Sequence, residues 1–459
     1  MNDTLIQALR GCVGTEGLLD AAAVAERGAG VFRQDRLQAC ALVRPSSTQE
    51  LSAVMALCHA HRQPVVAQGG LSGLVHGADA ASHELIISTE RMRSIEAIDP
   101  VGRTATVQAG VVLGRLREAV QAHGLQYGVD FGARDSATLG GSIATNAGGN
   151  SVIRYGMTRE SVLGLEVVLA DGTVLSSMNR MLKNNSGFDL KHLFIGSEGL
   201  LGVVTRAVLR LHEATDTPRT MLFACERFEQ VLALLRHLDK AFSGRLSAFE
   251  VMWRDYFELA VKGSPSGRSP LQNIAAYQVL VEVVDTDDEA LQSALESAQA
   301  LGYFDDAVLA ESLTQRRALW ALRESVSLTF QHGPDFAFDV SLPLADMAAY
   351  AEGVRSAVKA RWPAGHCWIF GHVGDGNLHI AVAVGSGDAL TQKHIETLVY
   401  EPLRELGGAI SAEHGVGLSK KAWLSVSRTP QELALMRQLK HTLDPLSLLN
   451  PGKMFDTAA

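Results

Sequence analysis

The sequence is poor in the features that mark secreted and membrane proteins. Its 459 residues contain five cysteines and no C-x-x-C pair, and an odd number of isolated cysteines favours free thiols in a reducing compartment over a disulfide framework. No apolar run approaches the roughly 18 residues that a membrane-spanning helix needs. Residues 1–20 lack the basic and apolar blocks of a signal peptide. We therefore expect a cytoplasmic protein with no membrane span.

The sequence also lacks a basic cluster, and its formal net charge is −9. Nucleic acid is therefore not an expected partner. Hydrophobic residues make up 47% of the chain and charged residues 20%, a composition that allows a sizeable core without membrane insertion. A chain of this length predicts two or three domains.

Two common nucleotide-binding motifs are absent. There is no P-loop, and no G-x-G-x-x-G opens a helix after a strand, so ATP and a Rossmann-bound dinucleotide are poor candidates. Glycine is nevertheless concentrated in three segments, 68–74, 139–150 and 196–205. The first follows a short apolar strand at 64–67, and glycine-rich backbone can turn its N–H groups toward a phosphate. The second is too rich in Gly, Ala and Asn for a core helix and indicates backbone packed around a large ligand, with a flexible loop as the alternative.

A pair of histidines flanks a predicted hairpin in the C-terminal half. The dipeptide Asp-Gly at 375–376 favours a two-residue turn between strands at 367–373 and 378–384. In that register His372 faces His379 on one side of the sheet, with Cβ atoms about 4.5–5.5 Å apart. This spacing suits two imidazoles on one metal ion. Two hydrogen-bonded sheet histidines without a ligand are the alternative.

A third metal ligand is available downstream. Catalytic zinc commonly takes three protein ligands, such as two His and one Glu, and keeps a position open for water or substrate. Glu413 fits this role. His414 follows it directly, and neighbouring side chains of an extended chain point to opposite faces, so we assign Glu413 as a ligand and His414 as a general base. The sequence thus predicts a divalent metal, with zinc first and manganese, iron or cobalt as alternatives.

The three glycine segments, in this order, resemble the FAD-binding domain of the vanillyl-alcohol oxidase/PCMH flavoprotein superfamily. The hairpin at 372–379, the sequence SAEHGVG at 411–417 and the sequence LNPGK at 449–453 are similar to its D-2-hydroxy acid dehydrogenase branch. That branch includes D-lactate, glycolate and D-2-hydroxyglutarate dehydrogenases. The similarity covers roughly residues 35–455.

The resemblance implies an α+β protein with a PCMH-type FAD-binding domain of two subdomains and an α+β cap domain with an antiparallel sheet. The FAD-binding domain is expected at 1–213, the substrate- and metal-binding cap domain at 214–420, and a C-terminal helical segment that returns to the FAD domain at 421–459. Independently of the resemblance, apolar periodicity predicts a helix at 228–242, and a final helix is expected at 430–443, ending before Pro445.

The resemblance also implies roles for individual residues. Those implied for substrate binding are Arg323, Ser327, Asn377 and His414. Those that match the metal ligands are His372, His379 and Glu413. Those implied for FAD binding are Gln68, Gly69, Gly70, Leu71, Ser72, Gly73, Leu74, Gly140, Gly141, Asn146, Gly148, Gly149, Gly156, Gly199, Val203 and Asn450.

Four positions depart from the pattern of this branch. His76 stands where glycine is usual, and Leu200 and Ser327 stand where threonine is usual. Ala337 stands where the hydroxyglutarate enzymes tend to have lysine. The missing cation weakens the expectation of a substrate with a distal carboxylate, because an unpaired buried carboxylate is costly.

Together these features predict an FAD-dependent dehydrogenase that oxidises a D-2-hydroxy acid, similar to D-2-hydroxyglutarate or D-lactate, with hydride transfer to flavin N5. The expected electron acceptor is an electron-transfer flavoprotein or a quinone, and a homodimer is one open oligomeric state. Two alternatives remain. One is an oxidase of the same superfamily that passes electrons to oxygen, and the other is a non-catalytic flavin-binding subunit.

Overall fold

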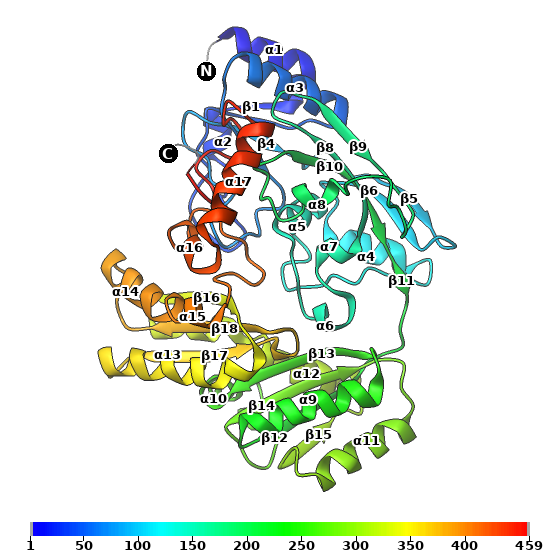
Figure 1. Ribbon diagram of the computed structural model, residues 1–459, viewed down its shortest axis with the longest axis vertical. Coiled ribbons are helices and arrows are strands. Elements are labelled where there is room, and N and C mark those ends of the chain that lie inside the picture. The colour runs from blue at the N-terminus through cyan, green and yellow to red at the C-terminus, as the bar shows by residue number, and fades with distance from the viewer. Residues whose placement is uncertain (1–2, 457–459) are drawn as a thin grey trace. The chain divides into compact units, whose positions relative to one another are not determined.

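The computed structural model describes residues 3–456, which form two units (Figure 1). Among the described residues, unit 1 comprises 3–149, 155–214 and 413–456, and unit 2 comprises 150–154 and 215–412. The main connections between the units lie at 214/215 and 412/413, whereas the sequence placed the boundaries at 213/214 and 420/421. Each unit has its own sheets and its own buried core.

A four-stranded sheet forms the N-terminal part of unit 1. Its elements are β1 (Leu18–Asp20), β2 (Ala41–Val43), β3 (Val65–Gln68) and β4 (Leu85–Ser88), with helices α1 (Asp3–Val13), α2 (Ala21–Ala25) and α3 (Thr48–Ala60). The strand order is β1-β2-β4-β3, and only the β1–β2 pair is antiparallel. Helices α1 and α3 cover one face, and α2 and the loop after it cover the other. Because both faces are covered, β4 is buried along its whole length.

A five-stranded antiparallel sheet forms the second part of unit 1, in the order β5-β6-β10-β8-β9. Its strands are β5 (Ile95–Asp99), β6 (Thr104–Gln108), β8 (Val162–Val168), β9 (Val174–Ser177) and β10 (Val203–Arg210). Its helices are α4 (Leu113–Gln121), α5 (Leu139–Thr145), α7 (Thr158–Ser161) and α8 (Lys191–Phe194). Two short strands, β7 (Leu125–Gln126) and β11 (His212–Glu213), form a separate pair, and α6 (Val152–Tyr155) lies where the chain changes units. The sheet, α4 and α5 share one core, to which Leu116, Ile143 and Val167 belong.

The second glycine segment contains a helix, so the prediction that it is no core helix is wrong. In α5, Leu139 and Ile143 are buried. A Cβ atom at Gly140 would lie 2.7 Å from the Cβ of Ala109, so only glycine lets α5 pack this close to the end of β6. The helix ends at Asn146, whose φ of 52° is left-handed, a conformation that asparagine tolerates. Glycine lowers the helix propensity here, but it permits the packing that offsets the loss.

The C-terminal part of unit 1 contains α16 (Leu424–Ser427) and α17 (Pro430–Leu443), and α17 confirms the helix predicted at 430–443. A capping box fixes its start, because Thr429 and Glu432 each accept a hydrogen bond from the other's backbone N–H. Pro430 occupies the first turn, where its missing N–H costs nothing.

A buried ion pair anchors the end of α17. Lys440 donates to Asp444 at 2.5 Å and to the carbonyl oxygens of Leu200 and Leu449, both at 2.8 Å. The side chains of Lys440 and Asp444 are 1% and 0% exposed. Burial lowers the pKa of Lys440, and the charge of Asp444 opposes that shift. The pair therefore ties the C-terminal segment to the third glycine segment.

Unit 2 is built on a seven-stranded antiparallel sheet in the order β15-β12-β14-β13-β17-β18-β16. Its strands are β12 (Arg219–Cys225), β13 (Leu246–Trp253), β14 (Tyr277–Val283), β15 (Asp306–Leu309), β16 (Asp335–Ser341), β17 (His366–Gly371) and β18 (Asn377–Ala383). Every residue of β13 is buried, because helices cover both faces of the sheet at this central strand.

Helices α10 (Arg254–Gly263) and α12 (Leu313–Arg323) pack on one face of this sheet, where Tyr256, Leu319 and Phe370 share a core. On the other face lie α9 (Phe228–Phe242), α13 (Met347–Arg361) and α14 (Ala389–Tyr400), while α11 (Asp288–Ala300) packs on α9 and α15 (Leu403–Leu406) follows α14 (Figure 1). Helix α9 confirms the helix predicted at 228–242. Within residues 3–456, none of the helices combines the length and the apolar character that a membrane crossing requires.

Replacing Lys440 by methionine should destabilise unit 1, because Asp444 would keep a buried charge without its counter-ion. Breaking such a pair costs about 3–5 kcal/mol. The expected result is a lower midpoint of urea unfolding, followed by circular dichroism. The control is Arg428→Met, which removes another i,i+4 pair, with Glu432, whose side chains are 49% and 47% exposed. The control should leave the midpoint unchanged, and equal shifts in both variants would contradict the anchoring role.

Candidate flavin and metal sites

A cavity of about 460 Å³ in unit 1 lies beside the first two glycine segments, and its size is typical of sites for small molecules and cofactors. Its lining includes residues 69–71 after β3, residues 110–112 after β6, Ser136 and Thr138 before α5, the arginines Arg27, Arg93 and Arg115, and Glu90, which pairs with Arg27. Guanidinium groups and glycine-rich backbone are both suited to phosphate oxygens.

Glycine is required where the loop after β3 meets the start of α5. A Cβ atom at Gly69 would lie 2.4 Å from Thr138 Oγ1, and one at Gly70 would lie 1.8 Å from the carbonyl oxygen of Ser136. The hydroxyl groups of Thr138 and Ser142 are buried, and within the described residues neither finds a hydrogen-bond partner. Thr138 lines the cavity, and a polar ligand there would give its buried hydroxyl a partner. These residues therefore fit the FAD that the resemblance implies.

Asn450 joins the first and third glycine segments. Its Oδ1 accepts from the backbone N–H of Ala67 at 2.8 Å, and its Nδ2 donates to the carbonyl oxygen of Glu198 at 2.6 Å. Its own φ of 44° is left-handed. A Cβ atom at Gly199 would lie 2.7 Å from Asn450 Nδ2. Asn450 therefore holds the two segments at a distance that only glycine permits.

The other residues expected to bind FAD are placed as follows. Gln68 ends β3 and donates to the carbonyl oxygen of Ala78 at 2.8 Å. Leu71 has a φ of 55°, Ser72 is half-buried, Gly73 has open space around it and Leu74 is 49% exposed. Gly141 lies in α5, Gly156 follows α6 and Val203 begins β10. The side chain of Asn146 accepts from the backbone N–H of Arg159 at 2.9 Å. Gly148 is buried, and Gly149 approaches the backbone of Asp130.

His372 and His379 lie together in unit 2, but the predicted register of their hairpin is wrong. Phe370, and not His372, pairs with His379. The backbone N–H of Asn377 donates to the carbonyl oxygen of His372 at 3.2 Å, so the loop holds the four residues 373–376 and not two. The rings of His372 and His379 still meet, with centroids 5.2 Å apart and an angle of 81°.

The backbone at the turn explains the longer loop. A two-residue type I′ turn needs positive φ at both central positions. Gly376 has a φ of 92°, whereas Asp375 lies in a 3₁₀ turn, Val373–Asp375. The Asp-Gly pair therefore ends a short helical turn here and does not form the hairpin turn by itself.

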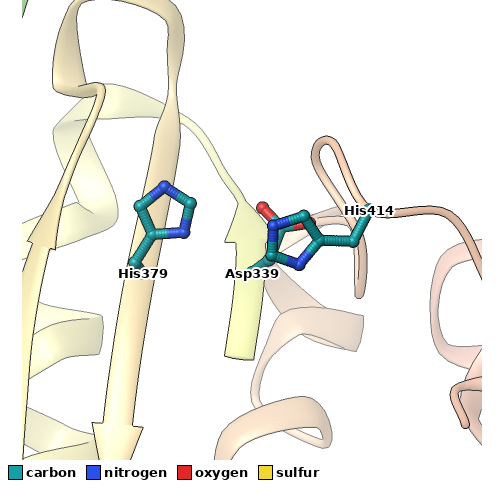
Figure 2. Close-up of side chains that lie close together, drawn as sticks. All are labelled: Asp339, His379 and His414. Carbon is teal, nitrogen blue, oxygen red and sulfur yellow. The ribbon is translucent and has the colours of Figure 1, made fainter. Parts of the chain in front are cut away.

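Glu413 and His414 complete two groups of potential ligands that share His379. In the first group, donor atoms of His372, His379 and Glu413 all lie within 4.8 Å of one another. In the second, the same holds for Asp339, His379 and His414. Figure 2 shows Asp339 and His379 on neighbouring strands and His414 on a loop. Two His and one Glu form a ligand set of catalytic zinc, so the first group fits a divalent metal.

Asp339 was not selected from the sequence. It pairs with His379 across β16 and β18 and is fully buried. Its carboxylate accepts from Asn377 Nδ2 at 2.8 Å and from the backbone N–H of Ala412 at 3.1 Å. A single aspartate in an apolar strand belongs to no motif, and only the strand register shows that it reaches the site.

Glu250 was also missed, and it holds two of the expected site residues. Its carboxylate lies 2.7 Å from Arg323 Nε and 2.6 Å from His372 Nδ1. Burial raises the pKa of Glu250, but its contacts with His372 and Arg323 outweigh burial and bring the pKa below its ordinary value. Glu250 is therefore an anion inside the sheet.

The residues expected to bind substrate differ in their surroundings. Arg323 ends α12, with a side chain 7% exposed, and its guanidinium lies 4.7 Å from the centre of the Phe370 ring. Asn377 is buried, and its Oδ1 finds no hydrogen-bond partner within the described residues. Ser327 is exposed, in a 3₁₀ segment after α12. Arg323 and Asn377 thus lie next to the two histidines in the sheet, whereas Ser327 lies outside the core.

Comparisons with known proteins agree with this arrangement. Residues 39–177 match the family described as FAD binding domain, and residues 216–454 match the family described as FAD linked oxidases, C-terminal domain. The D-2-hydroxyglutarate dehydrogenase of Xanthomonas citri pv. viticola is 40% identical over 91% of this chain and 89% of its own length. The chain belongs to the FAD-dependent D-2-hydroxy acid dehydrogenases of the vanillyl-alcohol oxidase/PCMH superfamily.

A second relative and a solved structure also match most of this chain. The mitochondrial D-2-hydroxyglutarate dehydrogenase of Bos taurus is 38% identical over 91% of this chain and 77% of its own length. The solved structure of p-cresol methylhydroxylase has a TM-score of 0.76 at 15% identity, over 99% of this chain and 97% of its own, and shows the same fold. As a D-2-hydroxy acid dehydrogenase, this chain binds FAD and is an oxidoreductase acting on CH–OH.

Replacing Gly70 by alanine should abolish FAD binding, because the added methyl group would overlap the carbonyl oxygen of Ser136 and push the loop away from α5. The control is Gly132→Ala elsewhere in unit 1, where nothing lies within 4 Å of the new Cβ atom. The ratio of flavin to protein absorbance in the purified variants measures the effect. Flavin content in Gly70→Ala equal to that of the control would contradict the close approach.

Proposed function

We propose that this chain oxidises D-2-hydroxy acids at a site formed by a divalent metal, Arg323 and His414. The observation that carries the proposal is the first ligand group, His372, His379 and Glu413, whose donor atoms lie within 4.8 Å of one another beside the buried Arg323. The names of the relatives, D-2-hydroxyglutarate dehydrogenases, support the substrate class. The electron acceptor, the oligomeric state and the cytoplasmic location stay predictions.

The chain's own residues have distinct tasks in this reaction. When bound, FAD supplies the hydride acceptor and the metal supplies a Lewis acid. The guanidinium of Arg323 holds the substrate carboxylate, because its planar set of donors matches two carboxylate oxygens. An imidazole nitrogen of His414 takes the proton of the substrate hydroxyl.

Replacing His379 by alanine should remove the metal and the activity but leave the flavin. The expected result is loss of D-2-hydroxyglutarate-dependent dye reduction and of bound metal, with an unchanged flavin spectrum. Chelation of the wild type should have the same effect. The control is His394→Ala on α14, where the imidazole contacts Arg361. Full turnover by metal-free protein would contradict the metal assignment, and no bleaching of the flavin by any D-2-hydroxy acid would contradict the proposed function.

The strand β16 bears on the choice of substrate. Ala337 is exposed and shares a face with Asp339, because side chains two residues apart on a strand point the same way. Phe338 points to the opposite face and packs on Tyr400, with ring centroids 5.3 Å apart. The face with His379 thus carries a small neutral side chain where hydroxyglutarate enzymes tend to have lysine.

Replacing Ala337 by lysine should favour a dicarboxylate, because a cation on this face can pair with the distal carboxylate. We expect the ratio of kcat/KM for D-2-hydroxyglutarate to that for D-lactate to rise roughly tenfold, about 1.4 kcal/mol. The control is Ala360→Lys on the exposed surface of α13, which adds the same charge elsewhere. A wild type already selective for the dicarboxylate, with no gain from the lysine, would contradict this account.

A further inference from the structure

Two buried glutamates of the unit 2 sheet form ion pairs with arginines of α12. Glu282 on β14 accepts from Arg316 Nε at 2.6 Å, and Glu250 on the neighbouring strand β13 accepts from Arg323 Nε at 2.7 Å. Because the two arginines are seven residues apart, about two helical turns, they lie on the same face of α12. The same kind of contact is therefore made twice, side by side.

The two glutamates differ in their further partners. Glu282 also accepts from Trp320 Nε1 at 2.7 Å and from Thr220 Oγ1 at 2.6 Å; Trp320 belongs to α12 and Thr220 to the neighbouring strand β12. The Oε1 of Glu250 instead lies 2.6 Å from Nδ1 of His372. Glu250 is therefore the one that connects α12 to the expected metal ligand.

The contact with Glu250 fixes which nitrogen of His372 can bind a metal. Arg323 donates to Oε2 of Glu250, so this carboxylate acts as an acceptor, and Nδ1 of His372 donates to its Oε1. Nε2 is then the nitrogen with the lone pair. It accepts from Arg323 Nη2 at 3.5 Å, and a metal on Nε2 would take the place of that contact.

Packing leaves this group little freedom. The side chains of Glu250, Arg323 and His372 are 1%, 7% and 8% exposed. The ring of Phe370 lies between the guanidinium of Arg323 and the ring of Tyr256, which stacks on it at 4.2 Å. The hydroxyl of Tyr256 donates to the carbonyl oxygen of Arg323 at 2.8 Å. Side chains locked in this way hold a ligand set in place before the metal arrives.

We propose that Glu250 is the positioning residue of the metal site, because its Oε1 holds Nδ1 of His372, which makes Nε2 the nitrogen that a metal would take, and its Oε2 holds Arg323. The inference rests on the metal binding proposed above. In metal sites a carboxylate on the distant nitrogen of a histidine orients the ring, and its removal lowers metal affinity about 10–100-fold. Since one carboxylate supports both groups, its loss should weaken metal binding and substrate binding together.

The test compares Glu250→Gln with the matched control Glu282→Gln, with Co²⁺ as the probe. Glutamine keeps the shape but has one acceptor oxygen, so it cannot accept from His372 and Arg323 at once. In Glu250→Gln we expect Co²⁺ affinity to fall about 10–100-fold, the d–d spectrum of bound Co²⁺ to change and the KM for D-2-hydroxyglutarate to rise. Flavin content should not change. Glu282→Gln should bind Co²⁺ with wild-type affinity and spectrum.

Each outcome supports or overturns the positioning role of Glu250. Wild-type affinity and spectrum in Glu250→Gln, or equal losses in both variants, would overturn the inference alone. A wild type that binds no Co²⁺ would overturn the proposed metal site and the inference with it. If Glu250→Gln does not fold, as judged by circular dichroism, ¹⁵N NMR of histidine-labelled wild type decides, with the signal assigned by His372→Gln. A protonated Nδ1 supports the inference, and an unprotonated Nδ1 overturns it.

Discussion

The buried charge of Glu250 determines which groups must surround it in the unit 2 sheet, next to His372 and Arg323. A lone anion in the middle of a sheet would cost several kcal/mol, so β13 can carry one only where cationic or hydrogen-bonding groups reach it. Arg323 does so from the last turn of α12, and His372 does so from the residue after β17. The lowered pKa of Glu250 follows from these partners. The position of the histidine hairpin relative to α12 is thus set by a charge in the sheet and not by the loop itself.

In unit 1, steric fit and not a buried charge determines how close the backbone segments lie. Its glycines allow backbone segments to approach within distances that no Cβ atom could share, as at Gly70 against Ser136 and Gly140 against Ala109. Such contacts supply little energy of their own, so other groups must hold the segments together. Asn450 does this through two hydrogen bonds, and the buried Lys440 holds the chain around it. The C-terminal segment is therefore part of the cradle, although it lies far from the glycine segments in the sequence.

Sequence reasoning was most successful where the signal is local. Apolar periodicity gave the helix at 228–242, and Pro445 bounded the final helix at 430–443; both are helices of the structure. It failed where contacts between segments far apart in the sequence determine the structure. The helix α5 exists because Gly140 fits against Ala109, a contact between segments thirty residues apart. Glu250 and Asp339 are isolated acids in apolar strands, and nothing in their neighbouring sequence distinguishes them from acids on a surface.

The histidine pair shows why a wrong register could still bring the right residues together. The predicted hairpin paired His379 with His372, and the structure pairs it with Phe370. The shift is two residues, and side chains alternate between the faces of a strand with a period of two. A shift of one residue would have sent His372 to the face of α9 and α13. A shift of two keeps it on the face of α10 and α12, where Glu250 can reach it. Whether the two histidines share a face therefore depends on whether the register shift is an even or an odd number of residues. The length of the turn matters less.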